Sequence, residues 1–224
     1  MTNSKTATEE QTSGIGRRRK AAGKDGRASY ATRRQEITEA AIRVFNKMGY
    51  KGASVSAVAA ELGIDRATLY YYYSSKEQMF DEIVRSVLEG NDELARRIAA
   101  SPMSPTRKLR ELVTAMMLSY AKNYPLLYIY IREDLTQVSG TRSSWSDQMR
   151  ALNRSIEHSI VAIIEQGYAD GSFRQLGSAR TVAYGILGML NWTHRWFRPD
   201  RSETAEEIGK VFAEMVLAGL ESPY

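Results

Sequence analysis

Hydrophobic residues recur along the chain at helical spacing, and they do not alternate with polar residues as in a β-strand. The first apolar stripe lies between a pair with capping-box spacing, Thr32 and Gln35, and Gly49, which suits a left-handed helix stop. Its members follow at intervals of three and four residues: Ile37, Ala40, Ala41, Val44, Phe45 and Met48. The pattern predicts an all-α protein, with three helices before Ser74 and six after it.

Two short helices are predicted after the first, each preceded by a residue that can cap a helix N-terminus. Ser54 precedes one of them, which ends at Gly63, and Asp65 precedes the other. A longer helix follows the capping-box spacing of Ser75 and Gln78. The later apolar stripes predict helices over 106–123, after Pro125, from about Met149 to Gly167, over 178–197 and over 203–220, with a polar loop near 139–144.

Residues 55–73 have the pattern of a helix-turn-helix. Ala59 is small where the second helix must cross, Gly63 stands in the turn, and Leu69 is placed to pack back on the first helix. This pattern alone is moderately specific. Residues 70–73 are four consecutive tyrosines, which cannot all face one core, so some are expected on the surface, where phenols can donate to phosphates.

With these features, the stretch 37–80 resembles the DNA-binding domain of the TetR family of bacterial repressors. Three residues depart from the commonest family pattern, namely Ala53, Asp65 and Tyr73 in place of Thr, Ser and Phe. The matching residues are Ala40, Ala41, Phe45, Gly49, Tyr50, Ser54, Val55, Val58, Ala59, Gly63, Ile64, Thr68, Leu69, Tyr70, Tyr73, Ser75, Lys76 and Glu77.

The resemblance implies a three-helix DNA-binding domain over 32–76 and a six-helix ligand-binding and dimerisation domain over 77–224. It also implies that the third helix enters the major groove of a double-stranded operator. Arg66 can pair with guanine O6 and N7, and Ala67 and Tyr71 are expected to touch bases. The residues expected at phosphates are Ser54, Thr68, Tyr70, Tyr72 and Lys76. Alternatively, Tyr70 belongs to the core together with Tyr73.

The excess positive charge lies on the leading arm. The chain has 31 Lys and Arg against 26 Asp and Glu, a net charge of +5. Residues 1–36 hold nine basic and four acidic residues, and nine minus four already gives +5. Residues 1–31 contain few large apolar groups and are predicted to be a disordered basic arm. Such an arm attracts phosphate backbones; the alternative is a solubilising tail.

The family's regulatory domain dimerises through its last two helices and encloses a pocket. Here the resemblance places these helices at about 178–198 and 203–220, where Gly185 and Gly188 allow close approach. Met and Tyr side chains line adaptable apolar cavities. The expected pocket residues are Met116, Met117, Tyr120, Tyr124 and Tyr128, with plain core packing as the alternative.

Trp192, Arg195 and Trp196 share one helix face, where two indoles flanking a guanidinium can stack an adenine and bind a phosphate. Together with Arg198 and Pro199, they resemble a subgroup of TetR-like regulators that respond to acyl-CoA thioesters of lipid or steroid breakdown. This resemblance implies a small apolar inducer, with an acyl-CoA as the candidate. It adds Trp192, Arg195, Trp196 and Arg198 to the ligand-binding residues. Core or interface packing is the alternative.

Other functional classes receive little support. The chain has no cysteine, and its two histidines, His158 and His194, lack metal-ligand spacing, so neither a metal nor a cofactor is expected. No nucleophile and base are arranged for catalysis, which disfavours an all-α enzyme. No apolar run of about 18 residues or secretory signal is present, which predicts a cytoplasmic protein, nucleoid-associated when bound to DNA.

The sequence therefore predicts a ligand-responsive repressor that binds a near-palindromic operator as a homodimer and leaves it when a small apolar inducer binds. A ligand-independent architectural DNA-binding protein is the alternative.

Overall fold

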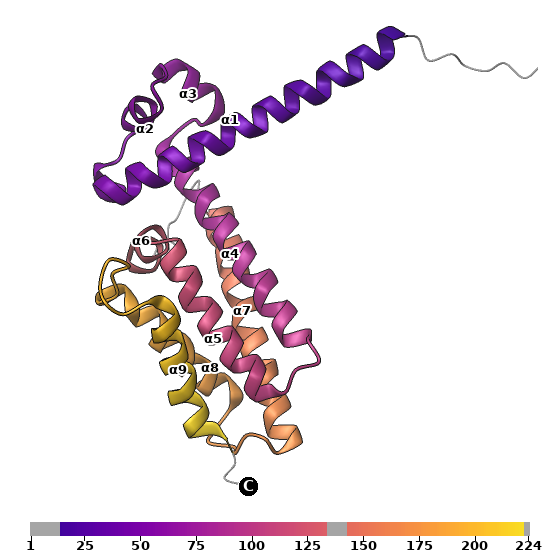
Figure 1. Ribbon diagram of the computed structural model, residues 1–224, viewed down its shortest axis with the longest axis vertical. Coiled ribbons are helices and arrows are strands. Elements are labelled where there is room, and N and C mark those ends of the chain that lie inside the picture. The colour runs from indigo at the N-terminus through magenta and orange to yellow at the C-terminus, as the bar shows by residue number, and fades with distance from the viewer. Residues whose placement is uncertain (1–13, 134–142, 222–224) are drawn as a thin grey trace, which may run out of the picture.

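The computed structural model describes residues 14–133 and 143–221. These residues form nine α-helices, one short 3₁₀ helix and an isolated bridge between Phe173 and Glu221, which confirms the all-α prediction. A head of three helices sits on an elongated body of six (Figure 1). The head contains α1 (Gly14–Gly52), α2 (Val55–Leu62) and α3 (Arg66–Tyr72). The body contains α4 (Lys76–Ala100), α5 (Pro105–Lys122), α6 (Leu126–Glu133), α7 (Ser143–Asp170), α8 (Ala179–Trp192), η2 (Thr193–Arg195) and α9 (Ala205–Leu220).

The predicted caps fix the start of the two short head helices. The Ser54 Oγ accepts a hydrogen bond from the backbone N–H of Ala57 at 3.1 Å, and α2 ends at Gly63 with φ 65°. Leu69 is fully buried between the helices of the head. Residues 55–73 thus form the expected helix–turn–helix geometry.

The first helix is longer than its apolar stripe. α1 begins at Gly14 instead of Thr32, so residues 14–31, expected to be disordered, are helical, and Thr32 is not an N-cap. Alanine, arginine and lysine in this segment have high helix propensity, and extending an existing helix requires no new nucleus. Gly49 breaks the helix with φ 69°, at the position where the sequence predicts its end. Residues 1–13 of the expected arm lie outside the described residues.

α4 joins the head to the body. The expected domain boundary at 76/77 falls in its first turn, and the helix continues without a break to Ala100. Phe80 is fully buried, with ring centroids 5.5 Å from Phe45 and 4.7 Å from Tyr50, so α4 supplies part of the head's core. An ion pair between Arg34 of α1 and Glu82 of α4 adds a second tie.

In the body, α5 packs along α9 and α4 along α7. α9 lies close to α5 at Gly209, because a Cβ at that position would lie 2.9 Å from the Thr114 Cα. Most of the polar loop predicted near 139–144 lies outside the described residues. None of the described helices combines the length and apolar composition needed to cross a membrane.

Candidate DNA-reading surface and ligand cavity

Arg66 occupies the first position of α3, where its side chain is exposed and oriented by Tyr70. The Arg66 Nη2 and Nε donate to the Tyr70 Oη at 2.7 and 3.2 Å, and the guanidinium lies 5.1 Å from the Tyr70 ring centroid. The neighbouring Ala67 is exposed as well. The start of α3 therefore presents a pre-oriented guanidinium beside a small apolar surface.

Asp65 holds the N-terminus of α3 in place. Its Oδ1 accepts from the Thr68 backbone N–H at 2.7 Å, and its Oδ2 accepts from the Thr68 Oγ1 at 2.5 Å. These hydrogen bonds, that from the Thr68 side chain above all, lower the pKa of the Asp65 carboxyl below its usual value. Asp65 thus remains an ionised cap, and the Thr68 hydroxyl is directed toward it.

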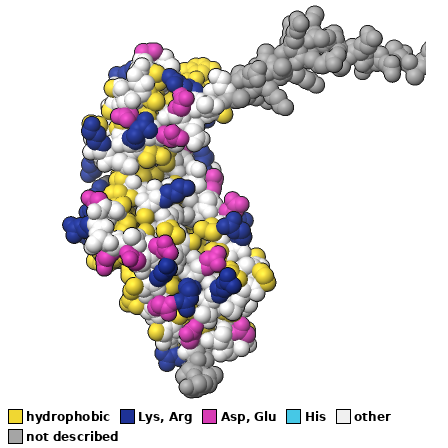
Figure 2. Space-filling model, viewed as in Figure 1, with side chains coloured by type: hydrophobic (Ala, Val, Ile, Leu, Met, Phe, Trp, Pro, Cys, Tyr) yellow, Lys and Arg dark blue, Asp and Glu magenta, His cyan; other side chains and the backbone are white. Residues whose placement is uncertain are grey.

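The four tyrosines divide by exposure. Tyr73 is buried, with its hydroxyl 3.0 Å from the Thr38 Oγ1, whereas Tyr70 is 42% and Tyr71 74% exposed. Tyr70 is therefore a surface residue and Tyr73 a core residue. Figure 2 shows hydrophobic side chains gathered at the top of the head, where α3 lies close to α1. Tyr72 is half-buried and stacks on Tyr30 of α1, with ring centroids 5.0 Å apart.

Ser54 and Lys76 flank this surface but differ in how they are bound. Ser54 is exposed, and its Oγ acts as an acceptor in the cap, which leaves the hydroxyl able to donate. The Lys76 ammonium instead donates to the carbonyls of Tyr50 at 3.0 Å and Ala53 at 3.1 Å, and lies 4.9 Å from the Tyr50 ring centroid. In this structure Lys76 ties the end of α1 to the start of α4.

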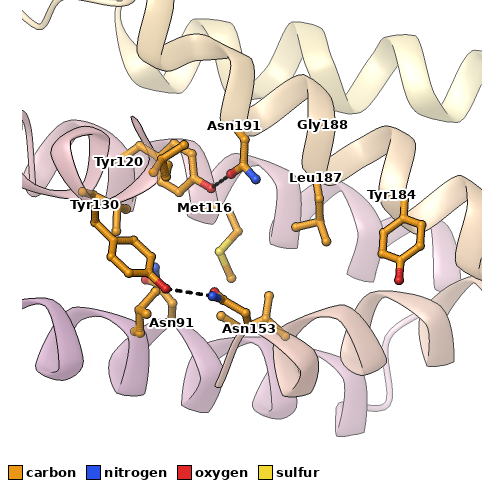
Figure 3. Close-up of a pocket in the computed structure, with 13 residues that line it drawn as sticks. Asn91, Met116, Tyr120, Tyr130, Asn153, Tyr184, Leu187, Gly188 and Asn191 are labelled. Carbon is orange, nitrogen blue, oxygen red and sulfur yellow. Dashed lines mark hydrogen bonds between the residues drawn. The ribbon is translucent and has the colours of Figure 1, made fainter. Parts of the chain in front are cut away.

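A cavity of about 460 Å³ lies inside the body, between α4, α5, α6, α7 and α8 (Figure 3). Two phenol–amide pairs face it: the Tyr120 Oη donates to the Asn191 Oδ1 at 2.5 Å, and the Asn153 Nδ2 donates to the Tyr130 Oη at 2.9 Å. Burial raises the pKa of Tyr120, so its phenol stays neutral. The lining residues are Leu88, Asn91, Met116, Tyr120, Leu127, Tyr130, Ile131, Asn153, Ile156, Tyr184, Leu187, Gly188 and Asn191, none of them charged.

Only some of the pocket residues that the sequence predicts line the cavity. Met116 and Tyr120 line the cavity, whereas Met117 is fully buried and faces α9 near Gly209. Tyr124 and Tyr128 line a separate pocket of about 90 Å³, together with Arg198, His194 and Arg132. Burial raises the pKa of Tyr128 to about 12.

The tryptophan–arginine run lies on the surface. Trp192 is 58% exposed and the Arg195 guanidinium lies 5.2 Å from its ring centroid. Trp196 packs edge-on against Phe212 of α9. Trp192, Arg195 and Trp196 do not line the cavity, but Trp192 directly follows Asn191, which does.

The amides of the cavity wall were not anticipated from the sequence. Asn91, Asn153 and Asn191 each interrupt an otherwise apolar helix stripe, and a polar residue at such a position is a signal for a buried hydrogen-bonding site. The Asn91 Oδ1 also accepts from the Ser119 Oγ at 2.6 Å. Among residues 14–133 and 143–221, no group of three or more potential His, Asp or Glu ligands for a metal ion occurs.

α8 and α9 carry large apolar side chains that are exposed to solvent. They are Tyr184, Trp192, Val211 and Met215, each more than half exposed. A Cβ at Gly185 or Gly188 would meet nothing within 4 Å. We call these six residues the α8–α9 face. Large exposed apolar side chains that gather on one surface are a feature of interaction sites.

A helix-turn-helix head fused to a helical body with an internal cavity defines the class of ligand-controlled transcriptional regulators. The chain belongs to the TetR family: residues 37–83 match "Bacterial regulatory proteins, tetR family" and residues 102–220 match "Tetracyclin repressor-like, C-terminal domain". It is a ligand-responsive DNA-binding transcriptional repressor and not an enzyme.

Individual relatives agree with this assignment. The chain is 30% identical over 201 residues to the HTH-type transcriptional repressor KstR2 of Rhodococcus jostii (strain RHA1), covering 89% of this chain and 97% of that protein. The solved structure of the ketosteroid transcriptional regulator KstR2 of Mycobacterium tuberculosis is similar with a TM-score of 0.74, 27% identity and coverage of 85% and 95%. AibR in complex with isovaleryl coenzyme A and operator DNA shares the fold, with a TM-score of 0.68, 23% identity and coverage of 82% and 97%.

Proposed function

We propose that this repressor binds a near-palindromic operator as a homodimer through α3, and that an acyl-CoA thioester whose acyl group enters the cavity releases it. The observation that carries the proposal is the exposed start of α3, where Tyr70 orients Arg66 beside Ala67. A guanidinium held in this way can form two hydrogen bonds to guanine in the major groove.

The DNA-contacting residues follow from their exposure. Arg66, Ala67 and Tyr71 are proposed to read bases, while Ser54 and Tyr70 contact phosphates. Thr68 is proposed to support the start of α3, because its hydroxyl already donates to Asp65. Tyr72 and Lys76 are proposed to support the surface, because the ring of Tyr72 stacks on Tyr30 and the Lys76 ammonium already binds carbonyls.

The α8–α9 face supports dimerisation. It is apolar and free of large side chains at Gly185 and Gly188, which suits close packing of helices against a second copy of the chain. Two recognition helices held in this way can read two half-sites about one turn of DNA apart.

The cavity supports a ligand whose buried part is uncharged and carries oxygen atoms. Its lining is apolar apart from amides and neutral phenols, which can bind carbonyl or hydroxyl groups but cannot neutralise a carboxylate. Tyr184 and Gly188 line the cavity and also belong to the α8–α9 face, so the cavity opens toward the proposed dimer interface. α8 ends at Trp192, so Arg195 lies in the short η2 and does not continue one α-helical face with Trp192 and Trp196 as the sequence predicts. Arg195 is exposed beside Trp192, and we propose that the phosphates of a coenzyme A thioester extend to it.

The inducer acts by favouring one arrangement of the two heads over another. A ligand can shift such an equilibrium only by its difference in affinity for the two arrangements. We propose that α4 transmits the difference, because Leu88 and Asn91 of α4 line the cavity and Phe80 of the same helix lies in the head's core.

The test is a mobility shift on DNA upstream of the protein's own gene, repeated with acyl-CoA thioesters, the matching free acids and coenzyme A alone. We expect a specific shift that only acyl-CoA thioesters abolish. Release by none of the thioesters would reject the coenzyme A part of the proposal and leave DNA binding intact.

Two variants distinguish operator reading by α3 from ligand sensing by the cavity. Arg66→Ala is expected to weaken operator binding by about 1–3 kcal/mol and relax the preference at one base pair. Asn153→Leu is expected to leave operator binding unchanged and weaken release, because it removes the amide paired with Tyr130. An unchanged operator affinity for Arg66→Ala would contradict the assigned reading surface.

A further inference from the structure

Beyond the helix-turn-helix, α1 continues as a helix that leaves the head. In Figure 1 its N-terminal part projects away from α2 and α3 and from the body. The part from Gly14 to Tyr30 spans 16 residue steps, which at 1.5 Å per step is about 24 Å. We call residues 14–30 the α1 extension.

The α1 extension carries as much net positive charge as the whole chain. It contains six basic residues and one acidic residue, Asp25, so six minus one gives +5, equal to the net charge of the protein. Residues 17–20 are four consecutive cations in the sequence. The basic residues are Arg17, Arg18, Arg19, Lys20, Lys24 and Arg27.

Tyr30 connects the end of the α1 extension to α3. Its ring stacks on Tyr72 at 5.0 Å with an interplanar angle of 29° and meets Tyr71 edge-on at 6.1 Å. Tyr71 and Tyr72 also contact each other edge-on at 5.1 Å. Because Tyr71 and Tyr72 belong to α3, this aromatic cluster attaches the α1 extension to the recognition helix itself.

We propose that the α1 extension is a second DNA-binding element, which contacts phosphates of the duplex outside the base pairs read by α3. This inference rests on the proposed operator binding by α3. A cationic helix beside a recognition helix meets the highest density of negative charge along the duplex backbone. At 3.4 Å per base pair, about 24 Å corresponds to about 7 base pairs of flanking DNA.

The composition favours DNA over a membrane surface as the partner. A helix that lies on a bilayer needs an apolar face opposite its charges. Ile15 is the only large apolar residue between Gly14 and Tyr30 in the sequence, too few to form such a face. Binding to phosphates alone predicts a contact that is strong at low salt and indifferent to base sequence.

The experiment compares the full-length protein with a variant that carries Arg17→Ala, Arg18→Ala, Arg19→Ala and Lys20→Ala. Operator affinity is measured between 50 and 200 mM salt on DNA that ends at the half-sites and on DNA longer by about 7 base pairs at each end. The wild type is expected to bind the longer DNA at least about tenfold more tightly, with a steeper salt dependence, by about 0.9 in slope for each phosphate contact. The variant is expected to bind both DNAs equally.

Further variants test whether the charge and the attachment of the α1 extension cause the preference for longer DNA. Substituting lysine for Arg17, Arg18 and Arg19 keeps the charge and should keep the preference for longer DNA. Tyr30→Ala should reduce this preference, because the extension loses its attachment to α3, whereas Tyr30→Phe should retain it. Thermal unfolding of each variant establishes that the head is folded.

An alanine variant that shows the wild-type salt slope and the wild-type preference for longer DNA would overturn this inference. If Arg66→Ala still weakens operator binding in that case, operator reading by α3 stands and only the α1 extension fails. If the wild-type protein binds no specific DNA, the proposed function itself fails.

Discussion

Asp65 illustrates how single residues set up the reading surface. The helix α3 has only two turns, and its start is held by one carboxylate that accepts two hydrogen bonds from Thr68. Without this cap, the first N–H groups of α3 would lose a partner and Arg66 would lose a fixed backbone.

We expect Asp65→Ala to lower the midpoint of thermal unfolding by about 2–4 °C and to weaken operator binding, while Asp65→Asn, which keeps an acceptor, does so less. The lowered pKa of Asp65 means that its stabilisation is complete above the ordinary aspartate pKa of about 4 and is lost as pH falls through the lower folded value. Unfolding measured against pH should show this loss in the wild type. If the wild type and Asp65→Asn lost stability to the same extent as pH falls, this expectation would be contradicted.

At this scale the sequence predicts local interactions better than distant ones. Ser54, Asp65 and Ser75 were identified as caps because a cap bonds to a residue only two or three positions away. The stacking of Tyr30 on Tyr72 and the binding of Lys76 to the end of α1 join residues far apart in the chain. No spacing rule indicates such contacts, which depend on how the helices pack.

At the scale of elements, two glycines with different surroundings test the packing of the body. Gly209 brings α9 against the backbone of α5 at Thr114, whereas a Cβ at Gly90, on the exposed side of α4, would meet nothing within 4 Å. Helix periodicity predicts both helices but does not distinguish these glycines. Only the distance between packed helices does so.

We expect Gly209→Ala to destabilise the protein by about 1–3 kcal/mol, because α9 must move away from α5. Gly90→Ala, the matched control, is expected to stabilise it by about 0.4–1 kcal/mol through a less flexible unfolded chain. Urea unfolding of both variants measures the two effects. Equal stabilities for the two variants would show that the α5–α9 contact is looser than described.

The hydrophobic periodicity of the sequence does not indicate the full length of α1. The apolar stripe begins at Ile37, which is the first buried residue in the part of α1 whose side chains are described, residues 29–52. Residues 14–31 need no stripe, since extending a helix that is already formed requires no new nucleus. An absent apolar stripe therefore indicates an absent core contact and not necessarily an absent helix.

At the scale of the whole molecule, the proposed dimer depends on the α8–α9 face. Val211 and Met215 stand one turn apart on α9, and each is more than half exposed. A charge placed between two apolar faces would have to be buried without a partner when the dimer forms.

We expect Val211→Glu combined with Met215→Glu to convert the dimer to a monomer in sedimentation velocity. The operator affinity should fall at least about tenfold, since a monomer can contact only one half-site. Leu176→Glu, also at an exposed apolar residue but in the loop before α8, is the control and should remain dimeric. A double variant that stays dimeric would place the interface elsewhere.

The unbroken course of α4 has a consequence for building hybrid regulators. Phe80 packs against Phe45 and Tyr50 of the head, while Leu88 and Asn91 of the same helix line the cavity. A graft of this head onto a foreign sensor cut at residue 76 would leave the head without the fully buried ring of Phe80. A workable junction lies between Phe80 and Leu88, so that the donor head keeps its own first turns of α4 and the recipient keeps its own cavity wall.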